Sequence, residues 1–301
     1  MAKKKDTRIL PVYDIETFRG TGSKNEFFDI KILEQHLHEH EVTLQPHRHD
    51  CYLILLVTHG HGKHIIDFET HDIQPYSAFF LTPGQVHSWS FTEDAKGYVI
   101  FFTSSFYMLY KREKHLSDFP FFRTLENPGT LQLDEHKEGL LITMLQEMVA
   151  ENTKEEFGRD EMLRNCLDII LTRLSRYYEQ STPLTANSSV TLQIRQLETL
   201  IETHFIKLKS PAEYADLMNV TARHLNDVCK LALNKTVSDL IHERQLLEAK
   251  RLLAFTMAGI KQIADHLEFN DKSYFMRFFK KYMGITPDQF RENYLKVHRH
   301  P

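Results

Sequence analysis

The strongest restriction on how this chain folds is an internal repeat close to its C-terminus. Tyr214–Val220 aligns with Ile263–Phe269, and Leu225–Lys230 aligns with Phe275–Lys280. Each copy contains two segments with apolar residues at helical spacing and a short turn between them. This pattern is typical of a helix-turn-helix motif, whose second helix can lie in the major groove of DNA. The sequence therefore predicts two such motifs in one chain.

Residues that favour helix starts stand where the predicted helices begin. The segment Ser210–Glu213 combines an N-cap serine, a proline at the first helical position and a glutamate that can complete a capping box. Thr221 precedes the second helix of the first copy, and Asn270 and Asp271 precede its counterpart in the second copy. These residues support the helix boundaries that the repeat indicates.

The two motifs are joined by a segment that is predicted to be one long helix. Ser238–Ala254 carries apolar residues at helical spacing, and a helix of this length is a rod of roughly 26 Å. With the width of the flanking helices added, the two second helices would stand near the ~34 Å that separates successive major-groove faces of B-DNA. One chain is thus expected to contact two adjacent turns of the double helix.

Charge is distributed unevenly along the chain. The net charge of the whole chain is −4, which by itself disfavours a nucleic-acid binder. From Val190 to Pro301, however, 17 basic residues stand against 13 acidic ones, whereas residues 1–189 contain 20 basic and 28 acidic residues. The C-terminal part is therefore the part suited to approach phosphates.

Three segments resemble the AraC/XylS type of transcriptional regulator, namely Arg244–Leu253, Ile260–Asp265 and Ser273–Arg291. The resemblance implies double-stranded DNA binding through both motifs and control of transcription initiation, usually activation, with RNA polymerase as a partner. It also implies a sensing domain in the residues that precede it. The family commonly has glycine where Asn234 and Glu268 stand. Asparagine tolerates a left-handed helix cap, whereas Glu268 makes the shape of the second turn harder to predict.

The helical phase of the two second helices separates core positions from positions that face DNA. Leu225, Val228, Tyr274, Phe275 and Phe278 are expected to pack inside. The outward positions suited to base edges are Arg223, Asn226, Asp227, Lys272, Ser273, Met276 and Arg277. Arginine and lysine can donate to guanine, asparagine can pair with adenine, and aspartate can accept from cytosine. The basic residues Lys230, Lys280 and Lys281 are expected to meet phosphate.

Residues 1–133 are predicted to form a β-barrel with an N-terminal arm. Short apolar runs broken by turn residues recur every eight to twelve positions, which favours an antiparallel barrel or sandwich. The runs are Phe28–Ile32, Cys51–Val57, His64–Phe68, Ala78–Leu81 and Tyr98–Phe102. The breaks between them include Gly60–Gly62, Gln74–Pro75 and Pro83–Gly84.

From residue 134 to residue 180 the apolar spacing changes to that of two amphipathic helices. The second helix, Gly158–Gln180, carries a wide apolar stripe that either packs into its own domain or forms a homodimer. Residues 181–190 are polar and aperiodic, which indicates a linker. The DNA-binding domain is then expected at 191–295, with a tail at 296–301. The predicted fold has two domains, a cupin-like barrel (a double-stranded β-helix) followed by helices, and an all-α domain with two helix-turn-helix motifs.

Histidines in the predicted barrel suggest a binding site. His47-Arg48-His49 and Pro83–His87 resemble the two signature segments of a cupin barrel, in which His-x-His and a later histidine converge on a metal. Imidazoles two residues apart on a strand point to one face, so three histidines alone could hold Zn²⁺ or Fe²⁺. The cupin glutamate is missing, because Leu53 and Ile54 stand where it is expected.

Without that carboxylate we expect a metal-free pocket that holds no cofactor. In it, His47, His49, Tyr52 and His87 would hydrogen-bond a small effector or one another. Trp89 and Tyr98 could line the same cavity, although core packing is the simpler expectation for both. The further histidine-rich segments, His36–His40 and His59–His64, are expected at the surface.

The favoured interpretation is a sequence-specific DNA-binding regulator without enzymatic activity. The alternatives are a cupin metalloenzyme with an accessory helical domain, which would need bound metal and turnover, and a helical interaction module that does not contact DNA. The longest apolar run, Leu53–Val57, is far shorter than a membrane span, and no secretory signal is found. Cys51, Cys166 and Cys229 are too widely separated for a disulfide frame and are expected as buried thiols. A cytoplasmic location with no membrane partner is therefore expected.

Overall fold

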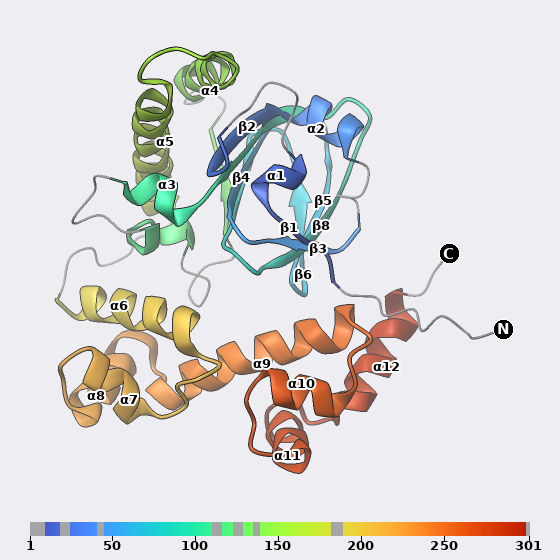
Figure 1. The fold of residues 1–301 in the computed structure, drawn as a ribbon, viewed down its shortest axis with the longest axis vertical. Helices are drawn as coiled ribbons and strands as arrows, with labels where there is room; N and C mark the ends of the chain where they lie inside the picture. Colours follow the sequence, from blue (N-terminus) through green and yellow to red (C-terminus); the bar gives the residue numbers. More distant parts are fainter. Residues whose placement is uncertain are drawn as a thin grey trace. The chain divides into compact units, whose positions relative to one another are not determined.

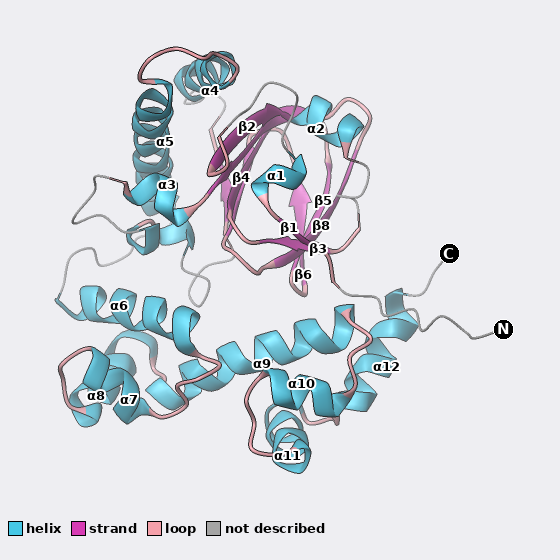
Figure 2. Cartoon of the chain, viewed as in Figure 1, coloured by secondary structure: helices cyan, strands magenta, loops and turns pink. Residues whose placement is uncertain are grey.

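The computed structural model describes residues 10–18, 25–40, 45–109, 116–122, 129–134, 139–181 and 189–298. The chain splits into two compact units, of which one is Pro11–Leu184 and the other comprises Thr185–Pro301 together with the first ten residues. The first unit contains the β-sheets and the second is helical, as Figures 1 and 2 show. Most of the predicted N-terminal arm, residues 182–188 of the predicted linker and residues 299–301 of the predicted tail lie outside the described residues.

The first unit contains two five-stranded sheets formed by its described residues. Their strand orders are β1-β3-β8-β5-β6 and β10-β7-β4-β9-β2. All strand pairs are antiparallel except β1 with β3. The strands are β1 (Val12–Tyr13), β2 (Phe28–Ile32), β3 (His47–His49), β4 (Tyr52–His59), β5 (Gly62–Ile66), β6 (Glu69–Ile73), β7 (Ser77–Leu81), β8 (Val86–Phe91), β9 (Lys96–Phe102) and β10 (Thr130–Gln132). Five strands or parts of strands coincide with the predicted apolar runs, and the predicted barrel is confirmed.

Two predicted turns owe their shape to glycine. Gly60, between β4 and β5, has a φ of +86°, and a Cβ there would lie 2.5 Å from the Cα of Ala95. Gly84, between β7 and β8, has a φ of +83°, and its backbone N donates to the carbonyl of His49 at 2.8 Å. Left-handed backbone is accessible to glycine without a steric penalty. The second turn thereby ties the start of β8 to β3.

The strand β4 is buried on both faces and separates two apolar cores. Leu53, Leu55 and Val57 point between the two sheets and form a core with Trp89 and Phe101. The alternate residues of β4 belong to a second core on the outer face of the sheet, where Ile54 and Leu56 are found. Because successive side chains of a strand alternate between faces, β4 sets which residues face the barrel interior.

Helices cover the outer face of the sheet that contains β4. The helices of this unit are α1 (Ile15–Phe18), α2 (Leu33–Glu39), α3 (Ser104–Met108), α4 (Gly139–Asn152) and α5 (Arg159–Ser181), and two short 3-10 turns, Leu116–Asp118 and Pro120–Phe122, lie between α3 and β10. Most of the predicted apolar stripe of α5 is buried in the outer core, namely Leu163, Leu167, Ile170, Leu171 and Leu174. Met162, an apolar residue of the same segment, is 55% exposed because it lies one residue before the buried face.

The second unit is built around the long helix α9. Its helices are α6 (Ser189–His204), α7 (Pro211–Leu217), α8 (Ala222–Leu233), α9 (Val237–Phe255), α10 (Ile260–His266), α11 (Lys272–Met283) and α12 (Pro287–His298). In Figure 1, α7 and α8 lie toward the start of α9, whereas α10 and α11 lie toward its other half. The predicted pair of helix-turn-helix motifs is therefore present, with the predicted connecting helix between them.

Charged side chains lie inside this helical unit. Arg244 of α9 is buried and its Nε donates to both carboxylate oxygens of Glu202 at 2.9 Å, while its guanidinium stacks 3.9 Å above the ring of Phe205. Glu248, also buried, accepts from Arg244 at 3.2 Å and from Arg251 at 3.1 Å. The pairing compensates the cost of burying these charges, so α9 is fixed by polar contacts as well as by its apolar face.

Among the described residues, no helix has the length and apolar character required to cross a membrane. All three cysteines are free. Cys51 and Cys229 are buried as predicted, but Cys166 is only half-buried because it stands at the edge of the buried face of α5. The prediction of three buried thiols was therefore wrong for Cys166.

Candidate functional site

The helices α7, α8 and α11 begin at the predicted capping residues. Ser210 and Glu213 form a capping box at α7, and the hydroxyl of Thr221 accepts from the backbone N of His224 at 3.1 Å at the start of α8. In the second motif, Asp271 accepts from the backbone N of Tyr274 at 2.7 Å at the start of α11. Each side chain satisfies a backbone donor that the helix itself leaves unpaired. These caps fix where the second helix of each motif starts.

The two turns share a left-handed residue at the equivalent position. Asn219 has a φ of +53° and Glu268 has a φ of +52°. The backbone carbonyls of Leu267 and Glu268 accept hydrogen bonds from Nζ of Lys209, which also lies 4.4 Å from the ring centroid of Phe269. Lys209 precedes α7, so it joins the start of the first motif to the turn of the second. Glu268 thus adopts the turn despite lacking the family's glycine.

Most of the predicted core positions of the two second helices are buried. Leu225, Val228, Phe275 and Phe278 all lie in the interior. Tyr274 is the exception, because it is 48% exposed. The buried face of α11 begins at the next residue, Phe275, and the ring of Tyr274 meets only the edge of the core at Phe269, with centroids 5.8 Å apart. The prediction that Tyr274 packs inside was wrong.

The predicted DNA-facing residues fall into an exposed set and two exceptions. Those exposed on α8 are Arg223, Asp227 and Lys230, and those exposed on α11 are Lys272, Ser273, Arg277, Lys280 and Lys281. Met276 is half-buried. The other exception is Asn226, the residue that occupies the position of Met276 in the first motif.

Both ends of the Asn226 amide are bound within the protein. Its Nδ2 donates to the carbonyl of Ala222 at 3.0 Å, and its Oδ1 accepts from the backbone N of Val237 at 3.0 Å. Val237 is the first residue of α9, whose leading N–H groups have no partner within the helix. Asn226 therefore fastens α8 to α9, and the expectation of a free amide pointing to adenine does not fit this arrangement.

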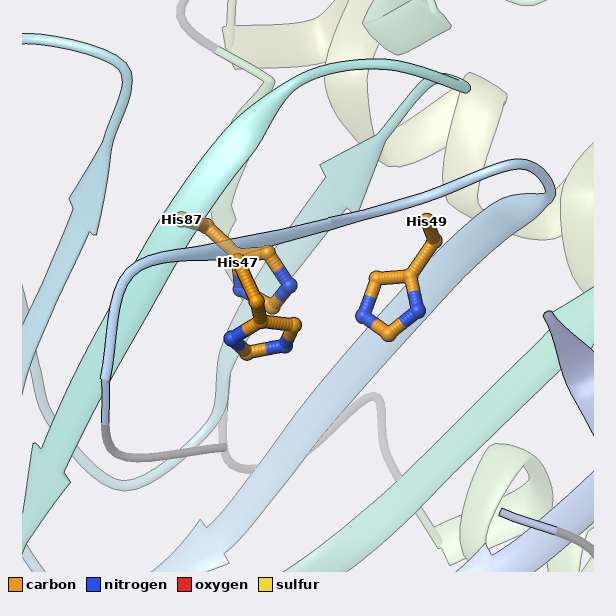
Figure 3. Close-up of side chains that lie close together, drawn as sticks. All are labelled: His47, His49 and His87. Carbon is orange, nitrogen blue, oxygen red and sulfur yellow. The ribbon is translucent and has the colours of Figure 1, made fainter. Parts of the chain in front are cut away.

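A second candidate site lies inside the barrel. His47 on β3 stands opposite His87 on the neighbouring strand β8, and His49 follows two residues later on the same face of β3. One ring nitrogen of each of these three histidines lies within 4.8 Å of the others. All three are buried, and Figure 3 shows their rings gathered in one region between the strands. The structure thus brings together three of the four predicted ligand-contacting residues.

Burial determines the protonation of these imidazoles. It lowers the pKa of His47 to about 4 and the pKa values of His49 and His87 well below the ordinary histidine value. Desolvation disfavours the charged form, and in this cluster each charged imidazole would also repel the next. At neutral pH the three side chains are therefore uncharged and each has a nitrogen with a free lone pair.

Three of the sequence predictions about this region, those for Tyr52, His64 and His36, were wrong. Tyr52 lies on the outer face of the sheet, where its ring contacts Phe102 and Phe122, because it alternates with the inward Leu53. His64, predicted at the surface, is buried on β5 with its Nε2 atom 3.1 Å from Nδ1 of His87.

Three more side chains, His36, Trp89 and Tyr98, differ in whether they lie near the histidine cluster. His36 of α2, also predicted at the surface, is buried against Phe18 and Phe101. Trp89 packs in the barrel interior against His87 and His64, whereas Tyr98 belongs to the outer core. Trp89 therefore forms part of the wall around the histidines, and Tyr98 does not.

The residues present fit a metal ion of the kind that imidazoles bind. Nε2 of His47, Nε2 of His87 and both nitrogens of His49 are buried and have no hydrogen-bond partner among the described residues. Such unpartnered buried nitrogens are costly, and a divalent ion such as Zn²⁺ or Fe²⁺ would satisfy them. The position of the missing cupin glutamate is taken by apolar side chains, since Leu53 faces the interior core and Ile54 the outer one.

Comparisons with known proteins cover both units. Residues 27–204 match the AraC-like ligand binding domain, and residues 214–293 match a helix-turn-helix domain. The HTH-type transcriptional activator RhaR of Mannheimia succiniciproducens is 22% identical over 257 residues, which is 83% of this chain and 88% of the relative. The activator RhaS of Enterobacter sp. (strain 638) is 24% identical over 260 residues, covering 84% and 89%. A crystal structure of ToxT from Vibrio cholerae aligns over 88% of this chain and 98% of its own, with 17% identity and a TM-score of 0.42.

Proposed function

This chain belongs to the AraC family of transcriptional regulators, and on that premise we propose that it binds DNA through α8 and α11 and responds to a ligand held in its barrel. The observation that carries the proposal is the pair of capped second helices, each presenting an exposed basic face on one side and a buried apolar face on the other. The names of the relatives favour activation of transcription.

Base recognition is assigned to residues in the first two turns of the two helices. Arg223, Lys272 and Arg277 donate to guanine, and Asp227 accepts from cytosine or orders Arg223. Ser273 can contact either a base edge or a phosphate. Met276, half-buried, offers an apolar contact to a thymine methyl group. Asn226 is left out of this set because its amide is engaged at the start of α9.

Phosphate contacts are assigned to the basic residues farther along the same helices. Lys230 stands near the end of α8, and Lys280 and Lys281 stand near the end of α11, all exposed. Such contacts set the position of the protein on DNA without reading sequence. Together with the base contacts, these phosphate contacts orient both helices toward successive major grooves. The helix α9 is about 28 Å long at 1.5 Å per residue, which is most of the distance between two such grooves.

Two protein partners belong to the proposal. RNA polymerase is the expected target of an activator. A second copy of the chain could pair through α5, where Met162 and Ile169 remain exposed seven residues apart on one side of the helix. Replacing Ile169 with glutamate should then shift the mass measured by sedimentation from dimer to monomer.

The metalloenzyme alternative rests on the histidine cluster. Its three imidazoles are suited to hold a metal, but the relatives are regulators. We propose that the chain is not an enzyme and that the barrel serves for sensing. Stoichiometric metal accompanied by turnover of an added substrate would favour the alternative.

The experiment that tests the DNA-binding function is selection from a random duplex library with the purified full chain at 100 mM salt. We expect enrichment of a motif with two half-sites about 10 bp apart. A chain in which Arg223 and Arg277 are both replaced by alanine should enrich nothing beyond the starting pool. Recovery of sequences without any shared motif by the unmodified chain would contradict the proposal.

A further inference from the structure

We propose that the barrel binds one divalent transition-metal ion through His47, His49 and His87, with His64 as the residue that orients His87. The site lies within one sheet, because β3 and β5 both pair with β8. This reverses the sequence-based expectation of a metal-free pocket. The residues also reach beyond the cupin-like His-x-His pattern, since His64 is not part of it.

The hydrogen bond of His47 directs one nitrogen to the proposed ion. Its Nδ1 atom lies 2.8 Å from the carbonyl oxygen of Gln45, which can only accept a hydrogen bond. Nδ1 must therefore carry the proton, so the lone pair of the uncharged ring is on Nε2. That Nε2 is buried and has no partner among the residues that the structure describes. A metal-binding histidine typically has this arrangement, with one nitrogen on the metal and the other donating to a carbonyl.

His87 has the same arrangement with a different acceptor. Its Nδ1 atom lies 3.1 Å from Nε2 of the buried His64. If Nδ1 donates to His64, the lone pair of His87 is on Nε2, which again is buried and unpartnered in the described part of the chain. His64 then accepts on Nε2 and carries its own proton on Nδ1. The function of His64 is thus to hold the tautomer and orientation of His87, and it contacts the ion only through that ring.

The distances fit a site that closes when the ion enters. The three nitrogens lie within 4.8 Å of one another, whereas two nitrogens bound at about 2.05 Å to a tetrahedral ion are about 3.3 Å apart. Each pair of rings must therefore approach by at most about 1.5 Å, which a modest rotation of each side chain can supply. The aromatic rings of Tyr13 and Phe18 lie 5.4 Å from those of His47 and His49, respectively, so the site is walled by apolar groups.

The ligand set limits which ion and which chemistry are expected. Three uncharged imidazoles, with no thiolate or carboxylate in the cluster, suit Zn²⁺, Fe²⁺ and neighbouring ions rather than Mg²⁺ or Ca²⁺. Three protein ligands also leave a coordination position open. The use of this ion as the signal rests on the proposed regulatory function, whereas the metal site itself does not.

Metal binding is tested on the purified full chain without DNA, after chelator treatment, with Co²⁺ alone as the probe. We expect one Co²⁺ per chain with visible ligand-field bands, and displacement by Zn²⁺. His47→Ala and His87→Ala should lose stoichiometric binding, whereas His59→Ala, an exposed histidine at the end of β4, should bind as the unmodified chain does. If the unmodified chain shows no bands, or if the triple alanine variant of the three proposed ligands keeps them, the proposal is overturned.

The role of His64 is tested by a conservative pair of variants. His64→Leu removes the acceptor for His87 and should weaken Co²⁺ binding 10- to 100-fold, and His64→Gln, which restores an acceptor, should recover part of the loss. A merely structural role predicts instead that both variants lower the unfolding temperature and leave Co²⁺ affinity unchanged. The unmodified chain supplies a further readout, since the ion should raise its unfolding temperature.

The metal proposal and the proposed function fail separately. If Co²⁺ does not bind but the random-library selection recovers a two-part motif, the metal site is refuted and the regulator stands. If Co²⁺ binds with the expected dependence on the histidines and no motif is recovered, the regulatory function is refuted and the metal site stands. Regulation by the ion itself requires that Zn²⁺ change the affinity of the unmodified chain for the recovered motif and not that of His87→Ala.

Discussion

The Oδ1 atom of Asn226 in α8 accepts a hydrogen bond from the backbone N of Val237, the first residue of α9, at 3.0 Å. Removing the amide by Asn226→Ala leaves the N–H of the buried Val237 without its partner. We expect a loss of about 1–2 kcal/mol in the free energy of unfolding, measured by urea denaturation. Asp227→Ala, at the adjacent exposed position, should change stability by less than about 0.5 kcal/mol. An Asn226→Ala variant that is fully stable but has altered base preference would show that Asn226 reads DNA after all.

The position of Asn226 shows what helical phase predicts and what it does not. The spacing of Leu225 and Val228 identified the buried face of α8 correctly, and the same reasoning placed Asn226 on the open side. The residue that captures its amide, Val237, lies eleven residues later on another helix. A tertiary contact of this kind leaves no mark in the local sequence pattern.

Buried ion pairs are a second contribution to the stability of the helical unit. Glu248 lies between Arg244 and Arg251, with oxygen–nitrogen distances of 3.2 Å and 3.1 Å. Glu248→Ala removes one carboxylate partner from each of two buried guanidinium groups, although Arg244 keeps Glu202, and should cost about 3 kcal/mol. The matched control is Glu243→Ala, which breaks an exposed pair with Lys235 and should cost less than about 1 kcal/mol. Equal effects of the two substitutions in a chemical unfolding experiment would contradict the assignment.

The turn of the second motif holds a strained residue. Glu268 has a φ of +52°, which a side chain with a Cβ adopts at a cost of about 1–2 kcal/mol. Glu268→Gly should therefore raise the free energy of unfolding, by about 0.5–1 kcal/mol after the greater flexibility of glycine in the unfolded chain is subtracted. Glu268→Ala removes the charge but keeps the Cβ and should give no such gain. A larger gain from alanine than from glycine would assign the effect to charge and not to backbone conformation.

Base and phosphate contacts on α11 can be separated by their salt dependence. Arg277→Ala should weaken binding to the preferred site by about 1–3 kcal/mol and reduce discrimination at one base pair. Lys280→Ala should weaken binding to all sequences similarly and lower the slope of log affinity against log salt by about 1. Fluorescence anisotropy at several salt concentrations measures both. Identical behaviour of the two variants would refute the division into base and phosphate contacts.

The sequence predicted the helical unit more completely than the barrel site. Apolar spacing and capping residues such as Thr221 and Asp271 are local signals, and they located α8 and α11 closely. In the barrel, the apolar run of β4 is buried on both faces. Its composition therefore does not show which alternate residues point into the barrel and which point to the outer core. Tyr52 was assigned to the interior for that reason.

The histidine cluster could also be predicted only in part from the sequence. His47, His49 and His87 were found through a pattern within the sequence, but His64 was not, because a histidine that directly follows Gly62 and Lys63 in a histidine-rich segment has the composition of a surface turn. Its burial follows from register, since His64 pairs with Trp89 across β5 and β8 and thereby lies beside His87. Strand register is a property of the assembled sheet.

We propose that one chain reads two successive major grooves with helices held a set distance apart by α9. The most direct test measures the affinity of the purified chain for its selected site after 5 or 10 base pairs are inserted between the two half-sites. We predict that both insertions reduce affinity to that of a single half-site, because the length of α9 matches only one spacing. Affinity that is unchanged by either insertion would contradict the account.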